Sequence, residues 1–524
     1  MSHDFEVAVV GFGPVGAACT ALLGAHGIRT LALDRARTVY EKPRAFALDH
    51  EIMRVFQQLG VADAIAPHTA PFTPSEYYGA DGQLIKRLGS VPPPYPLGWP
   101  PNLVFSQPPV ETLLRERAAA FASVDVALGT ELAALAQEAD AVTLTLRDDA
   151  GASRTARARY VVGCDGASST VRALCGLTCD DLGFDQSWLV ADLLVSNEAA
   201  VRLPQVSIQY CEPARPSTYL IGPGLHRRWE LMLLPGEDLR QMETEAQVWQ
   251  LLARWISPDE ATLWRAAAYR FHALVAHGWR QARVFIAGDA AHQQPPFTGQ
   301  GMCQGLRDVA NLAWKLHLVL QGKAAEPLLD TYATERAGHV RRYTTLIKDI
   351  GRLIGERDPQ AARARDARLL AEAGGEIRTT PRQHLLPPLT SGLIASDGHP
   401  ANGTIFPQPR VRLGDTIALL DSVAGVGFRV VADRGFALSA VRRRDNITQL
   451  EATVVCIGED SSTVGGTVGG ALSVTECDGV LARWFAQHQC AAAIVRPDHY
   501  VYGVAASAAE LDQHLVRICA SLNH

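Results

Sequence analysis

The chain has 524 residues, of which 47% are hydrophobic and 20% are charged. This length and composition predict two to four globular domains with ample core. The formal net charge of −6 gives no electrostatic reason to expect a nucleic acid or another polyanion as a partner. The sequence shows no signal peptide and no apolar stretch that could span a bilayer. We therefore expect a cytoplasmic protein that binds no membrane.

The first strong motif runs from Val7 to Asp34. An apolar run at residues 7–10 predicts a buried strand, and a glycine-rich turn follows at residues 11–16. A helix of small residues is expected at 17–26, and a second strand at 30–33. Strand, glycine turn, helix, strand and acid in this order are typical of a dinucleotide-binding βαβ unit.

Each of the three glycines in this turn has an expected structural role. Gly11 permits the tight turn, Gly13 lets a pyrophosphate approach the backbone, and Gly16 lets the helix lie close to the sheet. The start of the helix then offers free N–H groups to phosphate oxygens. Asp34 stands where a carboxylate would accept hydrogen bonds from an adenosine ribose.

Four later residues are weaker candidates for cofactor contacts. Arg44 lies in a Pro-Arg-Ala loop, where it is either a solvated charge or a contact for a phosphate or nicotinamide. Gln107 leads into a predicted helix. Asp165 and Gly166 follow a predicted strand at 158–162, and an Asp-Gly pair at a strand end is also a common turn.

Short strands predicted at 188–195, 206–210, 218–221 and 229–234 indicate a mostly antiparallel sheet that would form a substrate pocket. We interpret the basic segment 226–228 before the last of these strands as the charged tip of a hairpin. The alternative is that Arg227 or Arg228 meets a substrate carboxylate or an NADH phosphate.

A second glycine-rich segment follows a buried strand at 283–287 and precedes a helix predicted at 306–320. The helix has an apolar stripe interrupted by polar residues such as Asp308. Its glycine-rich entry again directs a helix N-terminus toward an anionic group. We expect His292, inside this segment, to position its neighbours.

Together, GFGPVG with Asp34, CDG at 164–166 and AGDAAHQQPPFTGQGMCQGLRDVANLAWKL at 287–316 resemble the group A flavoprotein aromatic hydroxylases. Stretches at 43–49 and 226–237 are most similar to the 3-(3-hydroxyphenyl)propionate hydroxylase branch. The resemblance covers about the whole chain. It implies an FAD-dependent monooxygenase that consumes NADH or NADPH and hydroxylates a small phenol, in aromatic degradation, through a flavin C4a-hydroperoxide.

The resemblance also implies an α/β fold with a Rossmann-type FAD-binding domain, an inserted and mostly antiparallel substrate domain, and a thioredoxin-like C-terminal domain. None of the ten cysteines forms a CxxC pair, so the last domain would be structural or dimer-forming, and no metal site is expected. The expected boundaries are 1–73, 101–183 and 278–373 for the FAD-binding domain, 74–100 and 184–277 for the substrate-binding domain, 374–404 for a linker, and 405–524 for the C-terminal domain.

By resemblance, a set of loop and turn residues binds FAD: Gly11, Gly13, Pro14, Val15, Gly16, Asp34, Arg35, Arg44, Gln107, Asp165, Gly288, Asp289, Pro296, Gly299, Gly301 and Met302. The sequence does not identify the base that deprotonates the phenol. Candidates for catalysis, by position alone, are His50, Tyr219 and Pro296, and Tyr77, Tyr78 and His226 also lie in segments that could line the pocket.

Two other functions remain open. One is an FAD hydroxylase of a polyketide or other secondary-metabolite ring, and the other is a flavin-dependent reductase or oxidase. A disulfide reductase would carry a second dinucleotide motif and a CxxxxC pair, and the sequence has neither. The expected partners are a small aromatic substrate, O2 and NAD(P)H, and the chain is a candidate homodimer.

Overall fold

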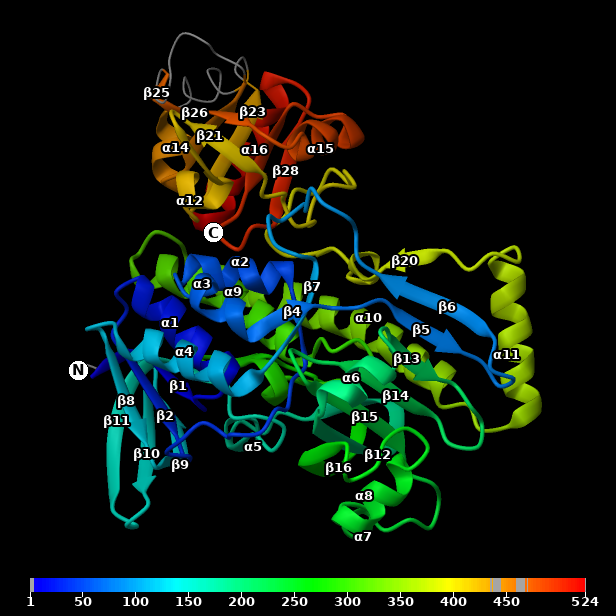
Figure 1. The fold of residues 1–524 in the computed structure, drawn as a ribbon. Coiled ribbons are helices and arrows are strands. Elements are labelled where there is room, and N and C mark those ends of the chain that lie inside the picture. Colours follow the sequence, from blue (N-terminus) through cyan, green and yellow to red (C-terminus); the bar gives the residue numbers. More distant parts are fainter. Residues whose placement is uncertain (1–3, 434–435, 437–443, 459–466, 469, 524) are drawn as a thin grey trace.

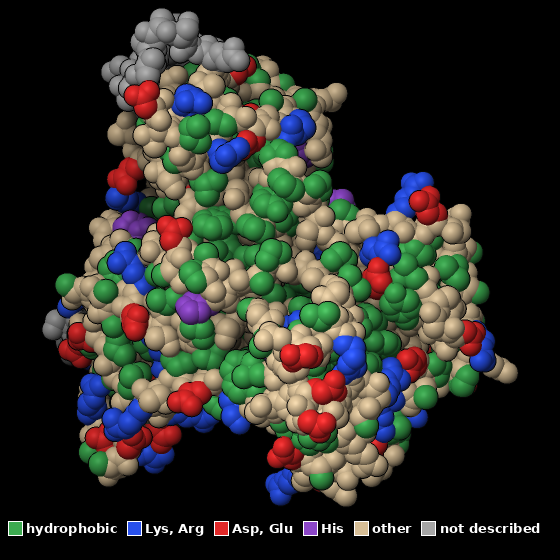
Figure 2. Space-filling view, viewed as in Figure 1, with side chains coloured by type: hydrophobic (Ala, Val, Ile, Leu, Met, Phe, Trp, Pro, Cys, Tyr) green, Lys and Arg blue, Asp and Glu red, His purple; other side chains and the backbone are tan. Residues whose placement is uncertain are grey.

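The protein is described by a computed structural model that covers residues 4–433, 436, 444–458, 467–468 and 470–523. Three large β-sheets organise three regions of the chain, and the C-terminal region, yellow to red in Figure 1, sits over the helices of the first region. On the face drawn in Figure 2, acidic and basic side chains are interspersed over the three regions. No helix in the described ranges is long and apolar enough to cross a membrane.

The first sheet contains the βαβ unit that the sequence predicts. Its order is β17-β18-β11-β1-β2-β8, and β9 and β10 extend it as antiparallel strands beside β11. Helices α4 and α9 both pack against α1. The strands are β1 (Phe5–Val10), β2 (Thr30–Asp34), β8 (Val124–Leu128), β9 (Thr130–Gln137), β10 (Val142–Asp148), β11 (Ser153–Gly163), β17 (Arg280–Gln281) and β18 (Val284–Ile286), and the helices are α1 (Pro14–Ala25), α4 (Gln107–Ala119) and α9 (Gly301–Leu320).

The second sheet is mostly antiparallel, as predicted, with the order β19-β16-β12-β15-β14-β13-β5-β6-β20. Helices α6, α7 and α8 cover one face, and α10 packs near the other. The strands are β5 (Ser75–Tyr78), β6 (Leu84–Gly89), β12 (Cys179–Val195), β13 (Ser207–Tyr210), β14 (Ser217–Ile221), β15 (His226–Met232), β16 (Ala261–Ala276), β19 (His292–Gln293) and β20 (Thr379–Pro381), and the helices are α6 (Asn197–Arg202), α7 (Leu239–Met242), α8 (Glu245–Leu252) and α10 (Asp330–Ile354).

Smaller elements join these two sheets. A three-stranded sheet lies beside α2, and α5 follows β11. Helix α11 lies at the far edge of the second sheet, near β6 (Figure 1). These elements are β3 (Ala47–Asp49), β4 (Thr69–Pro71), β7 (Asn102–Phe105), α2 (His50–Gln58), α3 (Ala62–Ile65), α5 (Thr170–Leu174) and α11 (Pro359–Glu372).

The C-terminal region has its own sheet, ordered β22-β21-β26-β24-β23-β27-β28, and its own apolar core. β23 and β24 are parallel, whereas β27 and β28 are antiparallel neighbours. The elements are β21 (Arg410–Leu413), β22 (Thr416–Leu419), β23 (Arg429–Asp433), β24 (Thr453–Ile457), β25 (Thr467–Val468), β26 (Ala471–Glu476), β27 (Ala492–Val495), β28 (Val501–Ala505), α12 (Leu420–Ala424), α14 (Arg444–Leu450), α15 (Val480–His488) and α16 (Ala508–Asn523).

Three details differ from the sequence-based expectations. The segment 226–228 is not a hairpin tip, because its three side chains are at most 6% exposed at the start of β15. Helix α9 begins at Gly301, five residues before the predicted start. Helix α11 was not predicted, and its hydrophobic pattern is weak because it buries few side chains.

Candidate functional site

A cavity of about 570 Å³ opens between the first and second sheets. On one side lie the carboxyl ends of β1, β2, β11 and β18, which is the edge where open parallel sheets bind ligands. The wall on the other side comes from β13, β14 and β15. All the predicted FAD-binding residues except Gly16 and Gly288 line this cavity.

The turn between β1 and α1 has the geometry expected of a phosphate-binding loop. Gly11 has φ +93°, and a Cβ on it would lie 2.5 Å from the carbonyl oxygen of Cys164. A Cβ on Gly16 would lie 1.8 Å from the Gly11 carbonyl oxygen, whereas one on Gly13 would meet nothing within 4 Å. No side chain caps α1 at its N-cap residue Gly13. The first N–H groups of α1 are therefore available to an anion.

Asp34 ends β2 and ties the glycine turn to the next loop. Its Oδ2 accepts from the Phe12 N–H and its Oδ1 from the Ala36 N–H, each at 2.7 Å. Each oxygen keeps a free acceptor direction, so the carboxylate can also accept from a ribose hydroxyl. Arg115 lies 4.0 Å from the carboxylate.

Gln107 and Arg44 meet where two loops approach each other. The side-chain carbonyl of Gln107 accepts from the Ala45 N–H at 2.7 Å, which fixes the loop that carries Arg44. The Arg44 guanidinium lies over the Tyr40 ring, 4.5 Å from its centroid, at the cavity wall. Asp165 instead receives hydrogen bonds from the Ser169 hydroxyl and the Val171 N–H, so it stabilises the start of α5.

The second glycine-rich segment leads to the N-terminus of α9. Its N-cap residue, Gln300, makes no capping hydrogen bond, and a Cβ on Gly301 would meet nothing within 4 Å. The Asp289 side chain faces the cavity and forms no hydrogen bond within the described part of the chain. Asp289 is exposed to the cavity, and desolvation by the surrounding protein raises its pKa, with His292 and Arg44 opposing the shift.

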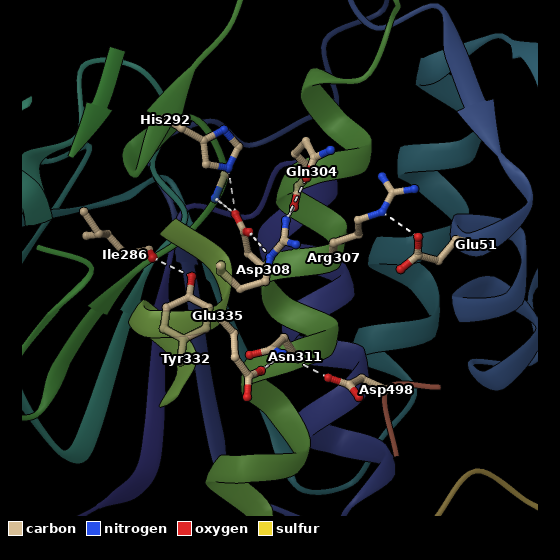
Figure 3. A network of polar contacts seen from close by, with 12 residues as sticks. Glu51, Ile286, His292, Gln304, Arg307, Asp308, Asn311, Tyr332, Glu335 and Asp498 are labelled. Carbon is tan, nitrogen blue, oxygen red and sulfur yellow. Dashed lines mark hydrogen bonds and ion pairs between the residues drawn. The ribbon is translucent and has the colours of Figure 1, made fainter. Parts of the chain in front are cut away.

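A buried polar network behind the cavity positions this segment (Figure 3). The Asp308 carboxylate accepts from the Gly288 N–H at 3.0 Å, from Nε2 of His292 at 2.8 Å and from Nε of Arg336 at 2.9 Å. Burial disfavours the Asp308 anion, but His292 and Arg336 outweigh burial and hold its pKa below the usual value. His292 thus contacts the carboxylate that holds this segment, which agrees with the positioning role expected for it, and Asp308 is fully buried.

Strand alternation decides which side chains of the second sheet face the cavity. Thr218 and Glu230 are register partners on β14 and β15 and both line it. Tyr219 follows Thr218 and Trp229 precedes Glu230, so both aromatic side chains point to the opposite face of the sheet. There they pack together with ring centroids 5.0 Å apart. Tyr219 therefore lies away from the cavity, contrary to its candidacy for catalysis.

The other two candidates for catalysis, Pro296 and His50, lie in different places. Pro296 lines the cavity. His50 does not; it is 6% exposed on α2 and borders a small neighbouring cavity with Thr298 and Tyr343. Burial lowers the pKa of His50 to about 4, which keeps the ring neutral at physiological pH.

The arginines at 227 and 228 are committed to protein contacts. Arg228 donates to Asp192 from Nε at 2.7 Å and from Nη2 at 3.1 Å, and from Nη1 to the Arg44 carbonyl at 3.1 Å. Arg227 donates to the carbonyls of Gly224 and His226. Neither guanidinium therefore fits the alternative that it meets a substrate carboxylate or an NADH phosphate.

Sequence reasoning missed Glu230, a carboxylate that is 4% exposed and lines the cavity. The signal was present in HRRWELM, because a strand that buries Trp229 in a core must turn Arg228 and Glu230 to the other face.

Comparisons with known proteins agree with this geometry. The family described as FAD binding domain matches residues 4–346, and the family described as HcaD C-terminal domain matches residues 403–521. A Rhodococcus jostii (strain RHA1) protein named probable NADH-specific resorcinol 4-hydroxylase is 38% identical over 97% of this chain and 93% of its own. A Mycobacterium sp. (strain JLS) protein named 3-(3-hydroxy-phenyl)propionate/3-hydroxycinnamic acid hydroxylase is 34% identical over 95% of this chain and 89% of its own.

The chain belongs to the FAD-binding family of group A aromatic hydroxylases. The resemblance inferred from the motifs is confirmed, and this hydroxylase is an FAD-dependent monooxygenase. The crystal structure of the flavin-dependent monooxygenase PieE with FAD and substrate has a TM-score of 0.80 and 21% identity, covering 99% of this chain and 100% of its own, which shows a shared fold. The uncapped starts of α1 and α9 and the open space at Gly13 fit a dinucleotide such as FAD.

Proposed function

We propose that this hydroxylase uses NADH and O2 to hydroxylate a small, single-ring phenol such as resorcinol. The observation that carries the proposal is the 38% identity, over nearly the whole chain, to the Rhodococcus protein named for that reaction. The motifs alone left NADH and NADPH open. The same similarity favours NADH.

We propose that FAD occupies the side of the cavity formed by the first sheet. Gly13, Pro14 and Val15 would hold the pyrophosphate, and Asp34 and Arg35 the adenosine end. The remaining cavity-lining residues of the predicted set would hold the ribityl chain and flavin: Arg44, Gln107, Asp165, Asp289, Pro296, Gly299, Gly301 and Met302. Gly16 and Gly288 would support these contacts from behind. Bound FAD, reduced by NADH, supplies the activated oxygen, and the chain positions the phenol and excludes water.

A second substrate class has one specific observation in its favour. Arg382 lines the cavity, lies 3.9 Å from the centroid of the Phe72 ring and forms no ion pair in the described part of the chain. This guanidinium could bind the carboxylate of 3-(3-hydroxyphenyl)propionate. Resorcinol and this acid are therefore the two substrates to compare.

We also propose the domain division predicted from the sequence. All strands of the first sheet lie within 1–73, 101–183 and 278–373, and the C-terminal sheet lies within 405–524. Within 374–404, β20 adds to the edge of the second sheet. A thioredoxin-like C-terminal domain is supported by the order β24-β23-β27-β28, with β23 and β24 parallel and the last pair antiparallel. The homodimer and the cytoplasmic location stay predictions, which light scattering and cell fractionation can test.

Rapid mixing of the purified yellow protein with NADH tests the function. We expect resorcinol to accelerate the anaerobic loss of flavin absorbance, and added O2 to yield a hydroxylated product. A larger acceleration and yield with 3-(3-hydroxyphenyl)propionate would favour the second substrate class. Formation of hydrogen peroxide alone with every phenol would contradict the hydroxylase proposal.

A further inference from the structure

Glu230 differs from the other buried carboxylates of the second sheet. Asp192 lies on the neighbouring strand β12, opposite Arg228, and accepts hydrogen bonds from His226 and Arg228. The Glu230 side chain forms no hydrogen bond to any residue that the structure describes, although it is only 4% exposed. Its remaining exposure is to the cavity. Such a group is costly to bury unless a ligand completes its hydrogen bonds.

The surroundings of Glu230 suit a phenol. Thr218, its register partner, and Gln209, the next in the same row, hydrogen-bond to each other at 2.6 Å. Apolar groups of the cavity, such as Leu220 and Phe297, can contact an aromatic ring. Glu230 is thus a free acceptor beside a surface that fits an aromatic hydroxyl compound.

We propose that Glu230 is the general base that accepts the hydroxyl proton of the phenol, an inference that rests on the proposed function. The substrate O–H bond breaks, its electron pair stays on the substrate oxygen, and a new O–H bond forms at a Glu230 carboxylate oxygen. The negative charge on the phenolate oxygen enriches the ring carbons ortho and para to it. Those carbons then attack the activated oxygen that FAD supplies.

The charges around Glu230 set the pH at which it acts. Burial raises the pKa of Glu230 to about 7; Arg228 on the same strand opposes this shift and Asp192 on β12 adds to it. The neighbour on β14, Thr218, is uncharged, and Arg382 bonds Ser75 on β5, three strands away. Hydroxylation should therefore increase with pH as Glu230 loses its proton, with a midpoint near this pKa.

The test compares the FAD-loaded wild type with Glu230→Gln, and with Glu198→Gln as a control that removes an exposed carboxylate from α6 of the same region. Resorcinol, NADH and O2 are the reactants, and product formed per NADH and the single-turnover hydroxylation rate are measured from about pH 5.5 to 9. A fluorinated resorcinol with a more acidic hydroxyl is run in parallel.

We expect Glu230→Gln to keep its FAD and to hydroxylate resorcinol at least about 100-fold more slowly than the wild type. Its KM should change by less than about tenfold. It should lose the rise in rate near neutral pH, and the fluorinated substrate should recover part of the rate. The control should match the wild type. The inference about Glu230 would be overturned if Glu230→Gln had the rates and pH profile of the wild type, or if the wild type itself lacked the rise in rate near neutral pH. Either result would leave the proposed function standing. Absence of product from every phenol with the wild type would overturn the proposed function.

Discussion

Buried carboxylates occur in two places: at the junction between the C-terminal domain and helices α2, α9 and α10, and in the cavity. Glu230 in the cavity differs from those at the junction in its hydrogen-bond partners. At the junction, Glu335 on α10 accepts from Lys315 and Asn311 on α9 and from Arg496. In the cavity, the buried Glu230 forms no hydrogen bond to any residue that the structure describes. Burial of a charge therefore does not itself indicate a functional site. A buried charge without a partner, beside a cavity, is the better sign.

The junction contains a second paired carboxylate of the same kind. Asp421 of α12 accepts from Nε and Nη2 of Arg54 on α2, and it also pairs with Arg429. These two arginines hold the pKa of Asp421 far below its usual value despite burial. Two paired networks thus fix the C-terminal domain to α2, α9 and α10.

The largest effect should follow from breaking the pairing at Glu335. Glu335→Leu leaves Arg496 and Lys315 without this partner, so the free energy of unfolding should decrease by about 3–5 kcal/mol. Denaturant titration measures this. Glu326→Gln, which breaks an exposed pair with Arg280, should cost at most about 1 kcal/mol. Equal unfolding midpoints for both variants would contradict the account of the junction.

The pH dependence sharpens the same prediction. Burial disfavours the Glu335 anion, but Arg496 and Lys315 outweigh it and lower its pKa from 4.5 to about 2. The folded state therefore gains stability from Glu335 above about pH 4.5 and loses it as pH falls toward 2, by about 3 kcal/mol in total. Glu335→Leu should lack this part of the acid destabilisation.

A smaller effect should separate two glycines of the first turn. Gly16→Ala forces a Cβ against the Gly11 carbonyl, so we expect a loss of about 1–3 kcal/mol in stability. Gly13→Ala meets no protein atom within 4 Å, so it should leave the stability of the FAD-free protein unchanged and weaken FAD binding. Calorimetry and flavin content measure the two effects. Unchanged FAD affinity in Gly13→Ala would argue against a pyrophosphate at this turn.

The smallest stability effect is expected at Asp289. Asp289→Ala removes a cavity carboxylate without a protein partner, so FAD retention should decrease about tenfold or more while the FAD-free protein keeps its stability. Asp308→Asn, which weakens a network of three hydrogen bonds, should instead destabilise the fold. Flavin content after purification and thermal unfolding distinguish the two. Full flavin content in Asp289→Ala would show that Asp289 is not part of the proposed cofactor site.

The sequence predicted most of the first sheet and brought together residues that line one side of the cavity, because these depend on local signals. The turn at 11–16 and the entry to α9 each combine glycines with a strand end and a helix start, and Asp34 is an acid at a strand end. The substrate side could not be predicted in the same way. Arg228 is paired through Asp192, 36 residues away, and such long-range pairing leaves no local pattern. Strand alternation around Trp229 did contain the information that excludes Tyr219 and indicates Glu230.

The central claim is that FAD and a phenol meet in the cavity and that oxygen is transferred to the ring. Single-turnover reaction of the NADH-reduced protein with resorcinol in ¹⁸O2 tests it most directly, with mass spectrometry of the product. The account predicts a hydroxylated product with one ¹⁸O atom. Oxygen from water in the product, or consumption of NADH with hydrogen peroxide as the sole product, would contradict it.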